Sequence, residues 1–326
     1  MMIVNNDCIL RVNNLVKEFP VQTGYFFARK HGVIRAVDNV SFHIMKGETF
    51  GLVGESGCGK TTMGRIIARL IQPDSGKIIF EGNEIQNIKG ESLRKLRRKI
   101  QIIFQDPLSS LNPRMSICEI VSEPLRIHNI VPKSKLKEET VKRLEEVGLN
   151  STFLNRFPHQ LSGGQRQRVL IARSLSLSPS FIVADEPVSA LDVSIQAQII
   201  NMLEDLREKI GFSCLFISHD LAVVRNISRR VAVMYFGRIV EIGPTDSIFK
   251  KPLHPYTGGL LESVPDVSAK RELGVIPGEP PDPLNIPPGC PFCPRCENST
   301  AICKKSMPPI EEKIEGRFVA CHNILD

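Results

Sequence analysis

The sequence has no long apolar run, and this shortage limits how the chain can meet a membrane. No stretch approaches the roughly 20 apolar residues that a bilayer-spanning helix needs. The first residues, 1–7, also lack the basic segment followed by an apolar one that marks an export signal. We therefore expect any membrane contact to be made through protein partners.

Aromatic residues are also few, and neither sign of charge is in large excess. The net charge of +7 is a mild excess that selects no partner by itself. The densest basic run, residues 89–99, has no aromatic residue between its charges, whereas surfaces that bind single-stranded nucleic acid combine the two. The run is better interpreted as the solvated face of a helix, and we expect no nucleic-acid partner.

The cysteines are numerous but unevenly placed. Five of the nine lie near the C-terminus, at positions 290, 293, 296, 303 and 321. Without an export signal, a metal site is favoured over disulfides. Cys290, Cys293 and Cys296 are separated by two residues each, a spacing found in both zinc and iron–sulfur sites, so spacing alone does not choose between them.

Short apolar runs alternate with longer amphipathic stretches along most of the chain. Residues 49–53 precede a helical pattern at 61–70, and residues 181–184 precede another at 195–210, which leads to an apolar run at 214–218. This alternation predicts an α/β fold with a mostly parallel sheet and crossover helices.

A glycine-rich run follows the first of these strands and opens a helix. Its glycines permit a tight turn whose backbone N–H groups converge on phosphate oxygens. We expect Lys60 to reach the β and γ phosphates and the Thr61 hydroxyl to bind Mg²⁺, whereas Cys58 is passive. The alternative is an ordinary glycine-rich turn, which would match by chance in about one chain in a hundred. The predicted ATP-binding run comprises Gly54, Glu55, Ser56, Gly57, Cys58, Gly59, Lys60, Thr61 and Thr62.

Two acids end the apolar strand at 181–184. Neighbouring residues on a strand point in different directions, so Asp185 and Glu186 can have different roles. We expect Asp185 to hold the Mg²⁺ shell and Glu186 to face the attacking water. The alternative is a solvated strand end, which the phosphate-binding run makes less favoured.

The run Leu161-Ser162-Gly163-Gly164-Gln165 repeats the signature motif of the ATP-binding cassette (ABC) family, which the chain resembles over nearly its whole length. The resemblance implies a P-loop ATPase core with an N-terminal antiparallel β region and a helical subdomain. It also implies roles for further residues. Gln105 matches the family's glutamine loop, which touches the metal. Asp192 matches a loop that crosses the subunit interface, and His219 matches the switch histidine.

In that family, the signature of one subunit closes over the γ-phosphate bound by its partner. The resemblance therefore implies that Ser162, Gly163, Gly164, Gln165 and Asp192 act on the partner's ATP. Two ATP molecules would lie buried between head-to-tail subunits. In each site Glu186 would be the general base, helped by Gln105 and His219. The Mg²⁺ ligands would be Thr61, Gln105 and Asp185.

The family also stacks an aromatic residue on adenine, upstream of the phosphate loop. Phe19 best matches that position. Tyr25, Phe26 and Phe27 compete with it, because residues 21–35 look like an insertion relative to many family members.

Several stretches look specifically like the ATPase subunits of oligopeptide and dipeptide importers, and nickel importers share much of them. These stretches are residues 51–60, 104–107, 110–115 and 254–257. The resemblance implies a second ATPase subunit in a heterodimer, two transmembrane permeases and an extracytoplasmic peptide-binding protein. The chain would be a peripheral protein on the cytoplasmic face of the plasma membrane. The alternative outside transport is a soluble ABC ATPase.

The resemblance also divides the chain. Residues 1–263 would form the ATPase domain, with a helical subdomain inserted at about 106–170. A proline-rich connector at 264–289 would lead to a cysteine-rich metal-cluster region at 290–326. Relatives with this tail bind a [4Fe–4S] cluster through cysteines that match Cys290, Cys296, Cys303 and Cys321, leaving Cys293 as a spare. Zinc is the alternative metal.

Overall fold

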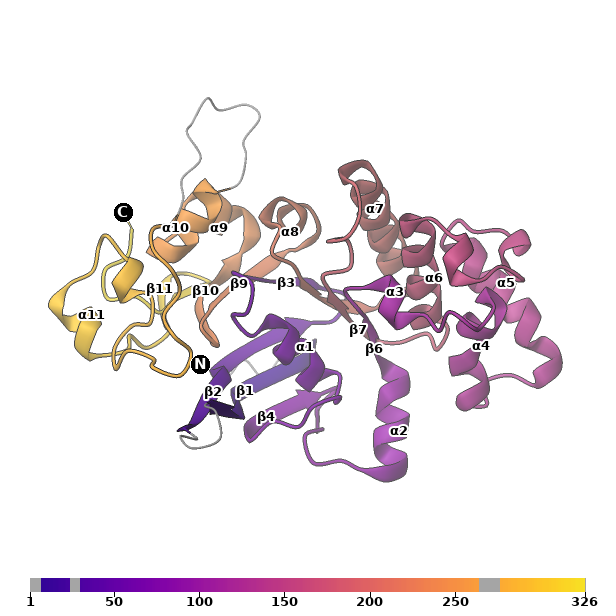
Figure 1. The fold of residues 1–326 in the computed structure, drawn as a ribbon, viewed down its shortest axis with the longest axis horizontal. Coiled ribbons are helices and arrows are strands. Elements are labelled where there is room, and N and C mark those ends of the chain that lie inside the picture. Colours follow the sequence, from indigo (N-terminus) through magenta and orange to yellow (C-terminus); the bar gives the residue numbers. More distant parts are fainter. Residues whose placement is uncertain (1–6, 24–29, 264–275, 326) are drawn as a thin grey trace.

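The computed structural model describes residues 7–23, 30–263 and 276–325 (Figure 1). An antiparallel sheet begins the fold, with its strands in the order β2-β1-β4-β5. Its strands are β1 (Cys8–Thr23), β2 (Lys30–Met45), β4 (Ser75–Phe80) and β5 (Asn83–Glu84). This confirms the N-terminal antiparallel region that the resemblance implied.

The central sheet has the order β11-β12-β10-β9-β3-β8-β7-β6. Strands β9, β3, β8, β7 and β6 run parallel, and β10, β12 and β11 continue the sheet antiparallel. The predicted mostly parallel core is therefore confirmed. The strands are β3 (Thr49–Val53), β6 (Ile100–Ile103), β7 (Phe181–Asp185), β8 (Ser213–Ile217), β9 (Arg230–Tyr235), β10 (Arg238–Pro244), β11 (Glu311–Ile314) and β12 (Arg317–Val319).

Both faces of the central sheet are covered, which explains its continuous apolar runs. Every residue of β3, β7 and β8 is buried. Alternate residues of β7 face opposite ways: Phe181 and Val183 pack with α1 (Lys60–Ile67) and the antiparallel sheet, whereas Ile182 and Ala184 pack toward the other helices. That second layer contains α7 (Val193–Ile210) and α8 (Leu221–Ile227).

Helices between β6 and β7 form a lobe at one end of the sheet (Figure 1). The charged stretch at 133–147, which its sequence predicts to be helical, forms a 3₁₀ turn followed by α5. Helix α6 begins at Gly163, two residues before the start at about Gln165 that the sequence predicts. The lobe contains α3 (Pro107–Ser110), α4 (Ile117–Ile127), α5 (Leu136–Glu146) and α6 (Gly163–Leu175). The basic run at 89–99 falls almost entirely within helix α2 (Gly90–Lys99), as expected.

The C-terminal residues continue the central sheet at the opposite end. Strand β12 pairs with β10, and the Ala320 N–H donates to the Val240 carbonyl at 2.8 Å. Arg317 and Glu241 form a buried ion pair at 2.6 Å between these strands. Around them lie α9 (Thr245–Lys250), α10 (Pro255–Glu262) and α11 (Ala301–Lys305). The cysteine-rich end is thus attached to the central sheet by strand pairing.

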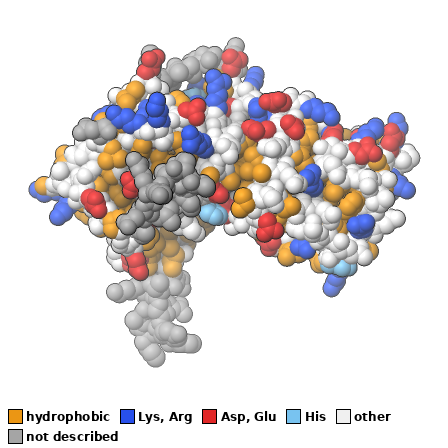
Figure 2. Space-filling view, turned by 90° about the horizontal axis from the view of Figure 1, so that it is seen from above, with side chains coloured by type: hydrophobic (Ala, Val, Ile, Leu, Met, Phe, Trp, Pro, Cys, Tyr) orange, Lys and Arg blue, Asp and Glu red, His pale blue; other side chains and the backbone are white. Residues whose placement is uncertain are grey.

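Two surface properties bear on the expected partners, namely the apolarity of the helices and the distribution of charge. Among the described residues, no helix combines the length and apolarity needed to cross a bilayer. On the face shown in Figure 2, basic and acidic side chains of the described residues are interspersed.

Candidate nucleotide site and cysteine pocket

The phosphate loop, residues 54–59, joins the buried strand β3 to α1. Gly54 and Gly59 have φ angles of +150° and +110°. A Cβ atom on Gly54 would lie 2.1 Å from the Met234 carbonyl oxygen, and one on Gly59 would lie 2.0 Å from that of Ala36. Glycine is therefore required at both positions, because the backbone has a positive φ and because a neighbouring backbone carbonyl leaves no room for a Cβ atom.

The Lys60 ammonium is folded back into this loop. Its Nζ donates to the carbonyl oxygens of Gly54 at 2.7 Å and Glu55 at 2.8 Å, and the residue is only 4% exposed. The charge therefore lies within the ring of backbone that would surround a phosphate.

Thr61 and Asp185 meet beside the loop. The Thr61 hydroxyl donates to Asp185 Oδ1 at 3.0 Å, which places two oxygen ligands suited to Mg²⁺ in contact. Burial raises the pKa of Asp185. A bound cation would favour its charged form, so these residues fit an Mg²⁺ site.

Glu186 lies between the other two predicted catalytic-site residues. Gln105 Nε2 donates to Glu186 Oε2 at 2.8 Å, and His219 Nδ1 lies 3.1 Å from Glu186 Oε1. These residues follow β6, β7 and β8, which are neighbours in the sheet, so their carboxyl ends bring the side chains together. Glu186 has a left-handed backbone, with φ of +47°, which takes it out of the regular alternation of β7. The arrangement places a carboxylate between two polar groups at the edge where Asp185 ends its strand.

The signature residues form the start of α6. Ser162 Oγ accepts from the Gln165 N–H at 3.3 Å, while Gln165 Oε1 accepts from the Ser162 N–H at 3.1 Å. This capping box explains why α6 begins at Gly163. Within the described ranges, no hydrogen bond joins residues 162–165 to the phosphate loop.

The predicted interface residue Asp192 lies near the signature. A Cβ atom on Gly164 would lie 2.7 Å from Ile195, in the first turn of α7, so glycine permits close packing there. Asp192 precedes α7, is exposed and makes no capping hydrogen bond. The signature residues and the loop that holds Asp192 therefore lie side by side.

Phe19 lies on β1 and pairs with Ile34 of β2. Two residues beyond Ile34, Ala36 makes the close approach to Gly59, so the strand pair borders the phosphate loop. The ring is 36% exposed, and the Lys17 ammonium lies 5.3 Å from its centroid. Its competitors, Tyr25, Phe26 and Phe27, lie outside the described residues.

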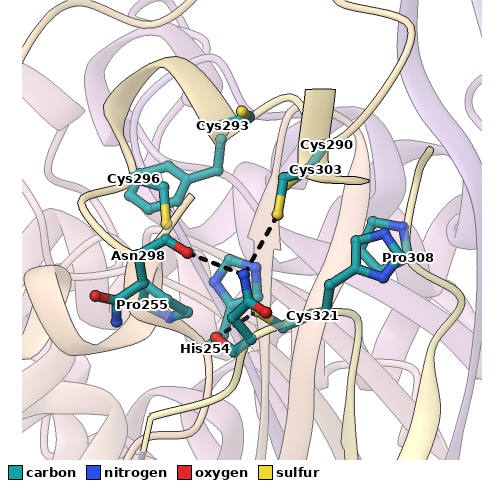
Figure 3. Close-up of a pocket in the computed structure, with 12 residues that line it drawn as sticks. His254, Pro255, Cys290, Cys293, Cys296, Asn298, Cys303, Pro308 and Cys321 are labelled. Atoms are coloured by element: carbon teal, nitrogen blue, oxygen red, sulfur yellow. Dashed lines mark hydrogen bonds between the residues drawn. The ribbon is translucent and has the colours of Figure 1, made fainter. Parts of the chain in front are cut away.

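The C-terminal cysteines gather around one pocket (Figure 3). Burial raises the pKa of Cys290 and of Cys321 to about 11 in each case. All the cysteines are free thiols, so the disulfide alternative is not realised here. The pocket is lined by Cys290, Cys293, Cys296, Cys303 and Cys321 together with His254 and other residues.

The described cysteines are not arranged as a set of ligands for the expected metal cluster. In residues 7–23, 30–263 and 276–325, no three His, Cys, Asp or Glu side chains are arranged to hold a metal ion. The thiols instead contact nearby protein atoms. Cys321 Sγ donates to the Asn323 carbonyl at 3.0 Å, and Cys303 Sγ accepts from Asn323 Nδ2 at 3.7 Å.

One ring nitrogen of His254 is also buried without a partner among the described residues. His254 lines the same pocket, and its Nδ1 accepts from the Tyr256 N–H at 3.0 Å. The nitrogen without a hydrogen-bond partner is Nε2. Burial lowers the pKa of His254 to about 3, so the ring is neutral and this unpaired nitrogen is costly to leave alone.

Comparisons with known proteins agree with this geometry. Residues 37–189 match the family model described as ABC transporter, and residues 240–303 match the model for the C-terminal region of oligopeptide/dipeptide transporters. The oligopeptide transport ATP-binding protein AppF of Bacillus subtilis (strain 168) is 50% identical, over 99% of both chains. The dipeptide transport ATP-binding protein DppF of Haemophilus influenzae is 44% identical over 98% of both.

The chain belongs to the ABC transporter ATP-binding family. A solved ABC cassette, the dimeric post-hydrolysis state of MJ0796 bound to ADP and Pi, superposes with a TM-score of 0.63 at 30% identity. The match covers 73% of this chain and 99% of that one. The predicted ABC ATPase fold and enzyme class are therefore confirmed.

Two residues from outside the phosphate loop of this ABC ATPase hold Glu55, and no sequence motif marks either as a partner of Glu55. Arg295, in the cysteine-rich end, donates to both carboxylate oxygens of Glu55, at 2.8 and 2.9 Å. Tyr256 Oη accepts from the Glu55 N–H at 2.8 Å. No local sequence pattern marks an arginine as the partner of a residue 240 positions away.

Proposed function

We propose that this ABC ATPase binds and hydrolyses ATP to power the import of oligopeptides or dipeptides. The observation that carries the proposal is the hydrogen-bonded set of Gln105, Glu186 and His219 beside the Thr61–Asp185 pair. The oligopeptide/dipeptide C-terminal match and the names of the relatives support peptide as the cargo.

The phosphate loop supplies the binding step. Its backbone N–H groups and the N-terminus of α1 would receive the phosphates, and Lys60 would exchange the carbonyls of Gly54 and Glu55 for phosphate oxygens. Thr61 and Asp185, with Gln105, would hold Mg²⁺, which would neutralise phosphate charge. Phe19 is the residue that we propose to stack on adenine.

Glu186 is the residue proposed to take the proton from the attacking water. Its carboxylate is only 13% exposed and is held from both sides by Gln105 and His219. Such positioning aligns the water with the γ-phosphate, and general-base catalysis is typically worth about 10²–10⁴-fold in rate. His219, which is more exposed, would sense whether the phosphate is present.

A second subunit would complete each site. Ser162, Gly163, Gly164 and Gln165 open a helix at the surface, and the neighbouring Asp192 side chain makes no capping bond. These features support the proposal that they act on the partner's ATP. The dimeric state of the solved cassette agrees with it.

We propose the remaining assembly on the same grounds. The partners are a second ATPase subunit in a heterodimer, two permeases and an extracytoplasmic peptide-binding protein. The chain would lie on the cytoplasmic face of the membrane, with its helical lobe receiving the permeases. The proposed division is 1–263 with an insertion at about 106–170, then 264–289 and 290–326.

Reconstitution tests the function directly. The chain, its second ATPase, the permeases and the binding protein would be placed in vesicles, and uptake of labelled peptide would be followed with ATP. We expect ATP-dependent peptide uptake. Uptake of nickel instead of peptide would identify a nickel importer. ATP hydrolysis without any binding to the permeases would identify an ATPase that works outside transport.

We further propose that the cysteine pocket binds a [4Fe–4S] cluster through Cys290, Cys296, Cys303 and Cys321, with zinc as the alternative metal. The thiols around one pocket and the unpartnered Nε2 of His254 support this proposal. Bound metal would supply a structural cross-link for a region with few core residues of its own.

Metal analysis after anaerobic purification tests the cysteine proposal. We expect iron and sulfide in the wild type, their loss in Cys321→Ser, and their retention in the matched control Cys293→Ser. Zinc in place of iron would contradict the cluster. A metal-free wild type would contradict both metals.

A further inference from the structure

Glu55 is held at three separate points. Its side chain is bound by Arg295, its N–H is bound by Tyr256, and its carbonyl accepts from Lys60 Nζ at 2.8 Å. The same residue therefore connects the phosphate-binding lysine to two residues that lie far along the chain. Movement of Glu55 would move the loop backbone that would receive the phosphates.

The arginine side of this contact is a built site. The Arg295 side chain is 4% exposed, and its Nε donates to the Pro277 carbonyl at 3.1 Å. The guanidinium also lies about 6 Å from the centroids of the Tyr235 and Phe292 rings, at 6.0 and 5.9 Å. Two parallel hydrogen bonds to one carboxylate fix direction as well as distance, which a single ammonium does not do.

We propose that Arg295 is a positioning residue for the phosphate loop, and that through it the cysteine-rich end controls ATP binding by the same chain. Two physical effects contribute. The arginine fork fixes Glu55 and so the backbone of the loop that would receive the phosphates. It also neutralises the Glu55 carboxylate, which would otherwise be an unpaired negative charge beside the triphosphate.

Arg295 lies within the cysteine-rich end, so the conformation of this region can affect ATP binding. Arg295 itself lies between Cys293 and Cys296, in a turn where the Cys293 N–H donates to the Cys290 carbonyl at 3.0 Å and the Arg295 N–H donates to that of Phe292 at 2.9 Å. Any change that opens this turn would release the fork. The inference rests on ATP binding at the phosphate loop, which the proposed function assigns.

Titration of ATP into the purified full-length chain tests the inference. We expect Arg295→Ala to raise the Kd for ATP about tenfold, since it leaves the Glu55 charge unpaired. Arg295→Lys keeps the charge but not the fork, so its Kd should lie between the two. Adding Glu55→Gln to Arg295→Ala should recover part of the affinity, because the unpaired charge is then gone.

Arg230→Ala is the matched control. Arg230 pairs with Glu48 at 3.3 Å, at the other end of the strand that leads into the phosphate loop. Its removal should lower the Tm but leave the Kd for ATP within about twofold of the wild type.

Three results would overturn the inference, and a fourth would contradict the proposed function instead. Equal Kd values for wild type and Arg295→Ala would overturn the inference, as would equal weakening in Arg295→Ala and Arg230→Ala. If Arg295→Ala does not fold, Arg295→Lys takes its place, provided that its Tm equals that of the wild type. A Kd for ATP of Arg295→Lys equal to the wild-type value would then overturn the inference. A wild-type chain that binds no ATP would instead contradict the proposed function.

Discussion

The nucleotide site and the cysteine pocket are assembled in different ways. In the first, Gln105, Glu186 and His219 follow neighbouring parallel strands and already contact one another. In the second, the cysteines lie in turns and a short helix, and Cys321 bonds to nearby backbone. Strand register alone brings side chains together in the first site, whereas loops need a further element to make thiols converge.

The largest expected effect is at the nucleotide site, where the side chains follow parallel strands. Glu186→Gln should lower ATP turnover by about 10²–10⁴-fold, because glutamine cannot accept the proton of the attacking water. ATP binding should persist, since the phosphate loop is unchanged. Steady-state hydrolysis and equilibrium ATP binding measure the two effects.

The control for that variant is Glu208→Gln on α7, where the carboxylate is 73% exposed and pairs with Arg207 at 3.5 Å. Its turnover should match the wild type. Unchanged hydrolysis in Glu186→Gln would contradict the proposed role of Glu186 as the general base of the nucleotide site.

The next effect concerns the attachment of the cysteine-rich end. Arg317→Ala removes one member of the buried pair with Glu241, whose side chain is fully buried. The Glu241 carboxylate would keep its hydrogen bonds from the N–H groups of Leu253 and His254 but lose its counter-charge. Removing one member of a buried ion pair costs about 3–5 kcal/mol, so the free energy of unfolding should fall by up to that amount. Denaturant titration measures this free energy. A decrease below about 0.5 kcal/mol would show that strand pairing holds the cysteine-rich end without help from the ion pair.

A smaller effect is expected where the two regions meet. Tyr256→Phe deletes the hydroxyl that accepts from the Glu55 N–H, at an expected cost of about 1 kcal/mol in the free energy of unfolding. Tyr235→Phe is the comparison, because its hydroxyl lies 3.4 Å from Arg295 and should matter less. A larger loss in Tyr235→Phe would reverse the ranking of these contacts.

The same contrast explains what the sequence could predict. The order of elements was readable because β7 and β8 are continuous apolar runs and the helices are amphipathic. The phosphate loop was readable because Gly54 and Gly59 tolerate no Cβ, which leaves a recognisable spacing. The meeting of Gln105, Glu186 and His219 follows from the edge shared by parallel strands.

Other features depend on contacts between distant residues. The start of α6 was misplaced by two residues because the Ser162–Gln165 capping box sets it, and the apolar pattern does not. The pairing of β12 with β10 and the Arg295–Glu55 ion pair have no local signature in the sequence, since contacts between residues so far apart along the chain are set by tertiary packing.

The proposal that each ATP needs residues from two chains is tested most directly by the rate of hydrolysis per chain against concentration. Monomeric chain should hydrolyse ATP poorly because it lacks the partner's Ser162 to Gln165 surface, and the rate should rise as chains associate with one another or with the second ATPase. The full rate in dilute protein shown by sedimentation to be monomeric would contradict the account.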